Sequence, residues 1–134
     1  MKPLQCSIVG LAFALTLASC RSSTSPPTQV PQGNWGGDHV GLIVEVPQVS
    51  FLFDCAGGNV NGSIPLAADG TFDVTGTFSD GGNAVGVDHS PHPARYTGRL
   101  TGQRITFTRV MIDGSHPDAS FSANLGAAWM IVAC

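Results

Sequence analysis

Charged side chains are scarce in this chain of 134 residues, of which only 11% are Asp, Glu, Lys or Arg, and the formal net charge is −3. Lysine occurs once, as Lys2, and glutamate once, as Glu45. A nucleic-acid-binding protein needs a basic surface to neutralise phosphates, so nucleic acid is not an expected partner. The length allows one domain of ordinary size rather than two.

A membrane-spanning run is also lacking, because the apolar stretch 8–18 has 11 residues and a transmembrane helix needs about 20. A positive start at Lys2, a short apolar stretch and then small residues are typical of a secretory signal peptide. Residues 21–32 contain three prolines and a single aliphatic residue, Val30. Such a segment buries too little apolar surface to fold, so we expect a disordered Ser/Pro tether.

The residues Leu17-Ala18-Ser19-Cys20 resemble the lipobox of bacterial lipoproteins, in which an aliphatic residue and two small residues precede a lipidated cysteine. The resemblance implies a lipoprotein signal peptide over 1–19 and attachment of palmitate-type acyl chains to Cys20, which anchor the protein to a membrane. Arg21 follows the cysteine where an Asp would resemble an inner-membrane signal. This implies a cell-envelope protein on the outer membrane, facing the periplasm. The alternatives are the outer face of the plasma membrane, the cell surface, or an ordinary signal peptide with a chance cysteine.

Four cysteines are present, and two of them have other expected fates: Cys6 lies in the signal peptide and Cys20 carries lipid. Cys55 and Cys134 remain, and their spacing has no CxxC pattern of a zinc site. In an exported domain the two are predicted to form a disulfide. The expected organisation is a signal peptide over 1–19, a lipidated cysteine with its tether over 20–32, and a folded domain over 33–134.

The folded domain alternates apolar and polar residues with period two, which predicts strands rather than helices. Eight short runs, separated by turn residues such as Asp69-Gly70 and Asp113-Gly114, favour an all-β fold. We predict a small antiparallel eight-stranded up-and-down barrel with one disulfide, which leaves no unpaired edge. A β-sandwich is the alternative. The first strand is expected to run from Gly33 through 46, and the last to be the apolar, largely buried run 127–134.

The order of these strands predicts which loops share an end of the barrel. It places the tether, the disulfide and the long loop 79–93 together at one end. Gly33-Asn34-Trp35 at the start of the first strand resembles the opening of lipocalin and avidin barrels, which implies a Trp that plugs one end. A plain core role for Trp35 is the alternative.

The same end is expected to collect the histidines. Neutral imidazole with carboxylate can bind a divalent metal or a small ligand. Solvated loops rich in short polar residues are the plainer interpretation, so no metal and no cofactor is assigned. The candidate residues are His39, His89, His92, His116 and Asp88.

No enzyme motif is present: there is no Gly-x-Ser-x-Gly elbow, no His-Glu-x-x-His helix and no phosphate-binding glycine loop. No catalytic residue is therefore assigned, and a non-enzymatic binding or structural module is favoured, with an unknown protein or small ligand as partner. The layout resembles lysozyme-inhibitor lipoproteins, through Phe53-Asp54-Cys55 and Ala94-Arg95-Tyr96, and implies an inhibitor of an envelope-directed hydrolase such as lysozyme. After cleavage, the chain contains five arginines and nine acidic residues, so its net charge is −4. A negatively charged protein is not suited to binding an acidic active site.

Arginines on two neighbouring predicted strands are the last candidate. If they share the outer face, they form a patch for an anionic partner. A solvated sheet face is the alternative. The residues are Arg95, Arg99, Arg104 and Arg109.

Overall fold

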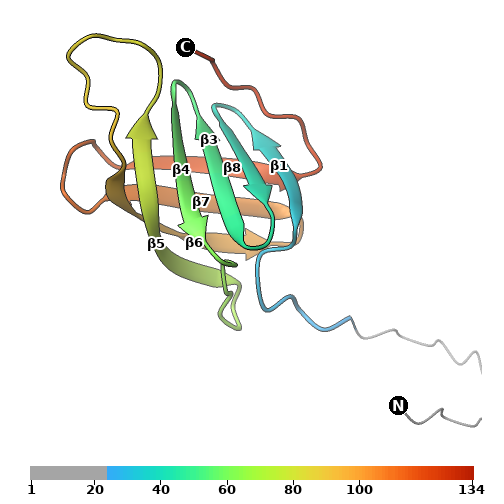
Figure 1. Cartoon of the computed structure of the whole chain (residues 1–134). Coiled ribbons are helices and arrows are strands. Elements are labelled where there is room, and N and C mark those ends of the chain that lie inside the picture. The colour runs from blue at the N-terminus through green and yellow to red at the C-terminus, as the bar shows by residue number, and fades with distance from the viewer. Residues whose placement is uncertain (1–23) are drawn as a thin grey trace, which may run out of the picture.

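The computed structural model describes residues 24–134, which form a closed barrel of eight antiparallel strands (Figure 1). Each strand pairs with its neighbours in sequence, and β8 pairs with β1 to close the barrel. The predicted eight-stranded up-and-down barrel is confirmed and the sandwich is not formed. The strands are β1 (Gly33–Gly37), β2 (Val40–Val44), β3 (Gln48–Phe53), β4 (Ala56–Asn61), β5 (Thr71–Asp80), β6 (His92–Thr101), β7 (Arg104–Met111) and β8 (Ala119–Leu125).

Aromatic side chains fill the interior of the barrel. The rings of Phe51 and Tyr96 stack with their centroids 4.1 Å apart, and those of Phe53 and Phe121 lie 4.8 Å apart. The Tyr96 hydroxyl donates to the Thr77 carbonyl at 2.8 Å, and burial raises the pKa of Tyr96 well above its ordinary value. Small barrels of eight strands either pack side chains inside or hold one ligand. In this barrel the centre is packed core.

The expected first strand is broken in two. The chain reverses at Asp38-His39, where His39 has φ 60°, a left-handed conformation that His and Asp tolerate better than most residues. Two glycines, Gly36 and Gly37, precede the reversal. The predicted number of eight strands is right, but two of the predicted strands are wrong. The predicted first strand is replaced by β1 and β2, and the predicted last strand does not form.

Residues 127–134 form a strap over the outer surface rather than a buried strand. Met130 and Val132 are 67% and 58% exposed, and the strap pairs with the barrel through a single bridge, Asp38 to Met130. The pairing of β8 with β1 leaves no edge for another strand. The indole of Trp129 instead covers Gly41 of β2, where an added Cβ would lie 2.9 Å from the ring.

The predicted disulfide is confirmed, and it fastens the end of this strap to the barrel. Cys134 bonds to Cys55, 79 residues earlier, in the turn between β3 and β4. The Cys55 amide also donates to the Val132 carbonyl at 3.0 Å. A covalent bond and a backbone hydrogen bond therefore hold the last residues of the sequence in place.

The reversal at Asp38-His39 changes which loops share an end. With one strand more before the first long loop, the start of β1 lies opposite to the loops 81–91 and 112–118, and the prediction that they share an end is wrong. Figure 1 shows the N-terminal segment leaving at the bottom and the loop after β5 at the top, near the C-terminal residue. We call the end at the start of β1 the proximal end, and the end with loops 81–91 and 112–118 the distal end.

The last residues of the predicted tether belong to the folded domain. The Val30 amide donates to the Ile64 carbonyl at 2.9 Å, and the Leu66 amide donates to the Thr28 carbonyl at 2.9 Å. Val30 is fully buried, and the Trp35 indole donates to the Pro31 carbonyl at 3.2 Å. The ordered domain thus begins near Thr28 rather than at 33, because one aliphatic residue finds a place in the core.

Candidate functional site

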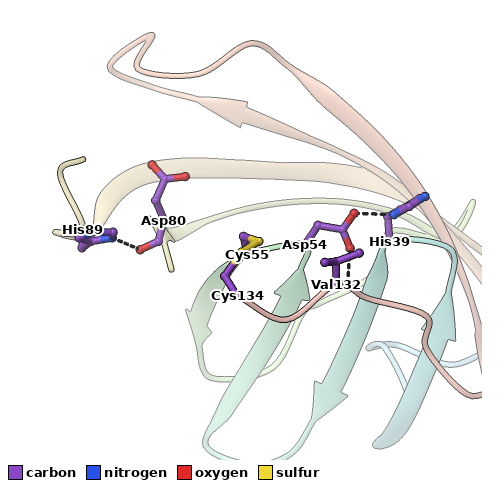
Figure 2. The surroundings of a disulfide bond; sticks show 7 residues. All are labelled: His39, Asp54, Cys55, Asp80, His89, Val132 and Cys134. Carbon is purple, nitrogen blue, oxygen red and sulfur yellow. Dashed lines mark hydrogen bonds and ion pairs between the residues drawn. A yellow bond between two sulfur atoms is a disulfide. The ribbon is translucent and has the colours of Figure 1, made fainter. Parts of the chain in front are cut away.

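All four histidines lie at the distal end, as the sequence predicted, and each contacts residues at the ends of strands or in loops of this end. Figure 2 shows the part of this end around the disulfide. His39 lies in the turn between β1 and β2, His89 and His92 at the end of the loop 81–91 and start of β6, and His116 in the loop 112–118. What the sequence did not predict is that every histidine contacts an aspartate or its backbone.

His39 holds the strap to the barrel. Its Nδ1 lies 2.5 Å from Oδ2 of Asp54, and Oδ1 of the same carboxylate accepts from the Val132 amide at 2.7 Å (Figure 2). The hydrogen bond from the Val132 amide, with a smaller contribution from His39, lowers the pKa of Asp54. One carboxylate therefore joins the β1–β2 turn to the strap, next to the disulfide.

His92 connects the two long loops. Its Nδ1 lies 2.7 Å from Oδ2 of Asp113, and its Nε2 lies 3.3 Å from Oδ2 of Asp88. The hydrogen bond to Asp113 raises the pKa of His92. Hydrogen bonds from Ser115 and His92 lower the pKa of Asp113 to about 2. The Asp113 carboxylate therefore stays ionised in any ordinary buffer and can pair with the His92 imidazolium whenever that forms.

His116 and His89 both contact Asp80 at the end of β5. Nε2 of His116 lies 2.8 Å from Oδ2 of Asp80. The His89 ring nitrogens contact the carbonyls of Asp80 at 3.0 Å and Ala84 at 3.3 Å, and the Asp80 contact is the main reason that the pKa of His89 is raised. His89 therefore fastens the base of the loop 81–91.

These pairs do not converge on one ligand position. Both ring nitrogens of His89 and of His92 already have hydrogen-bond partners. Within residues 24–134, no group of three or more His, Cys, Asp or Glu side chains is placed to hold a metal ion. The histidines therefore make separate contacts that join loops. The histidines and Asp88 suggested as metal ligands do not surround a common position.

Arg109 is not on the outer face, so the predicted patch of four arginines is wrong. Arg104 and Arg109 are five residues apart on β7, and side chains an odd number apart point to opposite faces of a strand. Arg109 is the single buried charged side chain of the described part of the chain. The alternation along β7 predicts this inward position, because Arg109 is an even number of residues from Ile105, Phe107 and Met111 and therefore points to the same face of the strand.

The guanidinium of Arg109 closes the distal mouth of the barrel. It lies 4.1 Å above the centre of the Phe78 ring, and its Nη2 donates to the Pro117 carbonyl at 3.0 Å. Its Nε is buried without a hydrogen-bond partner in the structure, and burial lowers the pKa of Arg109. The contact with Pro117 attaches the loop 112–118 to the core beneath it.

The other arginines of the suggested patch do lie outside, but two of them are paired. Arg95 forms a two-pronged ion pair with Asp73, in which Nε donates to Oδ1 at 2.7 Å. Arg99 lies 3.8 Å from Asp69. Exposed pairs of this kind contribute little to stability. They do reduce the positive charge available to an anionic partner.

Exposed apolar side chains are the feature of the distal end that sequence reasoning missed. The six exposed large apolar residues of the described chain include five on distal segments, with Val46 the exception. Period-two alternation has no bearing on loops, so no signal marked them. The five are Val85, Val87, Ile112, Met130 and Val132.

The distal end is also rich in aspartate: it has six, of which four contact histidines, and its one arginine in the described chain, Arg109, is buried. An apolar and acidic surface on loops that are fastened to a rigid barrel is suited to contacting a protein surface. The aspartates are Asp38, Asp54, Asp80, Asp88, Asp113 and Asp118.

Comparison with known proteins adds no information about this site. No protein-family model, no curated protein and no solved structure matches the chain. Among the described residues there is no helix with the length and apolar character needed to cross a membrane. The lipobox residues and Cys20 lie outside the described part of the chain.

Proposed function

We propose that this chain is a lipid-anchored lipoprotein of the bacterial cell envelope, on the outer membrane facing the periplasm, that acts as a non-enzymatic binding module. Its binding face is the distal end. The observation that carries the proposal is the separation of the two ends: the chain enters at the proximal end, and the exposed apolar loops lie opposite. A module anchored at Cys20 would present those loops away from the lipid.

The length of free chain supports the same arrangement. Because residues 28–31 pack on the barrel, the segment between the anchor and the domain is 21–27. Seven residues extend over at most about 25 Å. The proximal end would therefore stay close to the lipid surface, and a partner would reach the distal end first.

The packed interior supports surface recognition rather than a ligand inside the barrel. Phe51, Phe53, Phe107 and Tyr96 occupy the centre, where a lipocalin-like barrel would hold its ligand. A partner that uses the distal end would contact apolar side chains surrounded by aspartates. Such a surface fits a partner with apolar contacts among basic residues.

Metabolic labelling with palmitate tests the anchor. The native protein should be labelled and found in the membrane fraction, and Cys20→Ala should remove the label. An unlabelled, freely secreted native protein would overturn the anchor. The binding face is tested by copurification from the envelope: Val85→Asp with Ile112→Asp should lose partners that Val46→Asp, at the proximal end, retains. Equal losses in both would argue against the distal end.

An inhibitor of an envelope-directed hydrolase such as lysozyme is a second candidate, and the loop 81–91 favours it. This loop projects from the barrel but is fastened at its base, where the Gly81 amide donates to the Cys55 carbonyl at 2.6 Å beside the disulfide. A preorganised loop loses little entropy on entering a cleft. Inhibition of lysozyme by the native protein, and its loss on deletion of 84–87, would support this candidate.

A further inference from the structure

The tip of the long distal loop, residues 84–88, is held at both of its ends by histidines. At one end, Nε2 of His89 lies 3.3 Å from the Ala84 carbonyl oxygen. At the other end, Nε2 of His92 lies 3.3 Å from Oδ2 of Asp88. The hold on the tip therefore depends on whether these two Nε2 atoms carry a hydrogen.

Each of these two rings faces a second hydrogen-bond acceptor through its other nitrogen. Nδ1 of His89 lies 3.0 Å from the Asp80 carbonyl oxygen (Figure 2), and Nδ1 of His92 lies 2.7 Å from Oδ2 of Asp113. A neutral imidazole has one N–H, and only the imidazolium donates through both nitrogens. Each ring can therefore satisfy both of its acceptors only when it is protonated.

The carboxylates do not supply the missing hydrogen, because both are held in their ionised form. Ser90 donates to Asp88 from its hydroxyl at 2.6 Å and from its amide at 2.9 Å, and these bonds lower the pKa of Asp88. Ser115 and His92 lower the pKa of Asp113 to about 2. An ionised carboxylate only accepts hydrogen bonds. The contacts accordingly raise the pKa of both histidines that hold the tip.

The other two histidines of the distal end differ, because a neutral ring satisfies their contacts. Nε2 of His116 lies 2.8 Å from Oδ2 of Asp80, and its Nδ1 lies 3.2 Å from Oγ of Ser115, a hydroxyl that can donate. His39 contacts the carboxylate of Asp54 through one nitrogen. The need for a proton on both nitrogens is therefore confined to the two rings that hold the tip.

Carboxylates also outnumber cations around these two rings. Those that face the rings come from β5 and from both long loops, and they are Asp80, Asp88 and Asp113. The ring of His116 lies 6.4 Å from that of His92, but it is paired with Asp80. The buried charge of Arg109 interacts with Asp80 and Asp118. The surroundings therefore favour protonated rings.

We propose that His89 and His92 form a proton-dependent clamp, which holds residues 84–88 when both rings are protonated and releases them when the rings are neutral. Each neutral ring would keep its shorter contact, to Asp80 or Asp113, and lose its longer contact to the tip. Deprotonation would thus free the tip without unfolding the domain.

The clamp affects the distal binding face, and this consequence rests on the proposed function. Val85 and Val87, two of the five exposed apolar residues of this end, lie in the tip. A held tip presents them in a fixed position and loses little entropy on binding. The base of the loop stays fixed in both states, because the Gly81 amide donates to the Cys55 carbonyl. The clamp would therefore make the distal face preorganised in acidic surroundings and loose above neutral pH.

Carbon-13 relaxation of the full-length protein in detergent tests the clamp, because the order of Cα–Hα bonds is measured without interference from amide exchange. In native protein the order parameters of residues 84–88 should be about 0.85 at pH 5.5 and below about 0.6 at pH 8.5. The change should follow the titration of the His89 and His92 rings, read from their carbon-13 shifts. A tip that is equally ordered at both pH values, or that loosens outside these titrations, would overturn the clamp.

Asp88→Asn tests the role of the proton on His92 directly. Its amide oxygen can still accept from Ser90, while its amide nitrogen can donate to Nε2 of a neutral His92 ring. The order at residue 88 should therefore rise with pH in this variant instead of falling. A fall as large as in native protein would contradict the clamp.

His116→Gln is the matched control, because it removes a histidine of the same end whose contacts suit a neutral ring. It should keep the native pH dependence, whereas His89→Gln with His92→Gln should abolish it, and circular dichroism verifies the fold of each variant. Loss of the pH dependence in His116→Gln as well would overturn the assignment to the other two rings. These measurements use no partner, so failure of the clamp is distinguished from failure of the distal binding face, which copurification tests.

Discussion

The two ends of the barrel are closed by different chemistry. At the proximal end, buried apolar side chains do the closing: Val30 packs in the core with Trp35 and Ile64, and all three are essentially inaccessible to solvent. At the distal end, a disulfide, four histidines in contact with aspartates and the guanidinium of Arg109 hold loops that remain exposed.

This difference indicates which end of the barrel can carry a binding site. Apolar burial is insensitive to pH and to redox conditions, and it gives a rigid end near the anchor. Ion pairs and a covalent link can fix loops whose backbone and apolar side chains stay accessible, and binding residues are concentrated on such loops. The stability of the distal end should therefore depend on pH and on redox conditions, and that of the proximal end should not.

The largest expected effect comes from opening the proximal end. Trp35→Ala removes the largest fully buried side chain and its hydrogen bond to Pro31, and should lower the free energy of unfolding by about 3–5 kcal/mol. Urea unfolding measures it. Val46→Ala, 66% exposed at the same end, should change stability by less than about 0.5 kcal/mol. Similar losses in both variants would contradict closure by burial.

The next effect comes from the distal end. Replacing both Cys55 and Cys134 with Ala removes a link across 79 residues of sequence, and should cost about 2–4 kcal/mol. Hydrogen exchange should localise the change, because the amides of Met130 and Cys55 donate to Gly37 and Val132 across the strap. Their protection should fall more than that of the amides in β6 and β7. Unchanged protection of the strap would show that Trp129 holds it without the disulfide.

The sequence predicted the fold class because alternation and turn residues are local signals. The barrel and the gathering of the histidines at one end followed from these signals, whereas the disulfide followed from Cys55 and Cys134 being the two cysteines without another expected fate. The reversal at Asp38-His39 was missed because an apolar alternation continues on both sides of it. The strap was misjudged because apolar content at Trp129 does not tell inside from outside, and only the closure of β8 on β1 excludes a ninth strand.

The candidate site was predicted less fully, for reasons that are also physical. Histidine positions are visible in the sequence, but their aspartate partners come from other loops, 21 residues away for His92 and Asp113 and 36 for His116 and Asp80. Those pairings depend on loop conformation. The interior position of Arg109, by contrast, was available from its odd spacing to Arg104, so that error could have been avoided from the sequence.

The smallest expected effect is a pH dependence that belongs to the distal end alone. The pKa of His92 is raised above its ordinary 6.5, so its stabilising contact is fully present below about pH 6.5 and is lost as the pH rises through the raised value. The pKa of Asp113 is lowered from 3.8 to about 2, so its contribution is present above about pH 4 and is lost as the pH falls toward 2.

The pair therefore stabilises the fold most between about pH 4 and 6.5. In His92→Gln the side chain cannot be protonated, so the gain in unfolding midpoint between pH 8.5 and 5.5 should be smaller than in native protein. Part of the gain should remain, because the pKa of His89 is also raised. Trp35→Ala should instead lower the midpoint equally at both pH values, because the indole packs in the apolar core and hydrogen-bonds to the Pro31 carbonyl, which does not titrate. A pH dependence in His92→Gln as steep as in native protein would mean that the distal loops do not depend on this pair, and the contrast between the two ends would then rest on the disulfide.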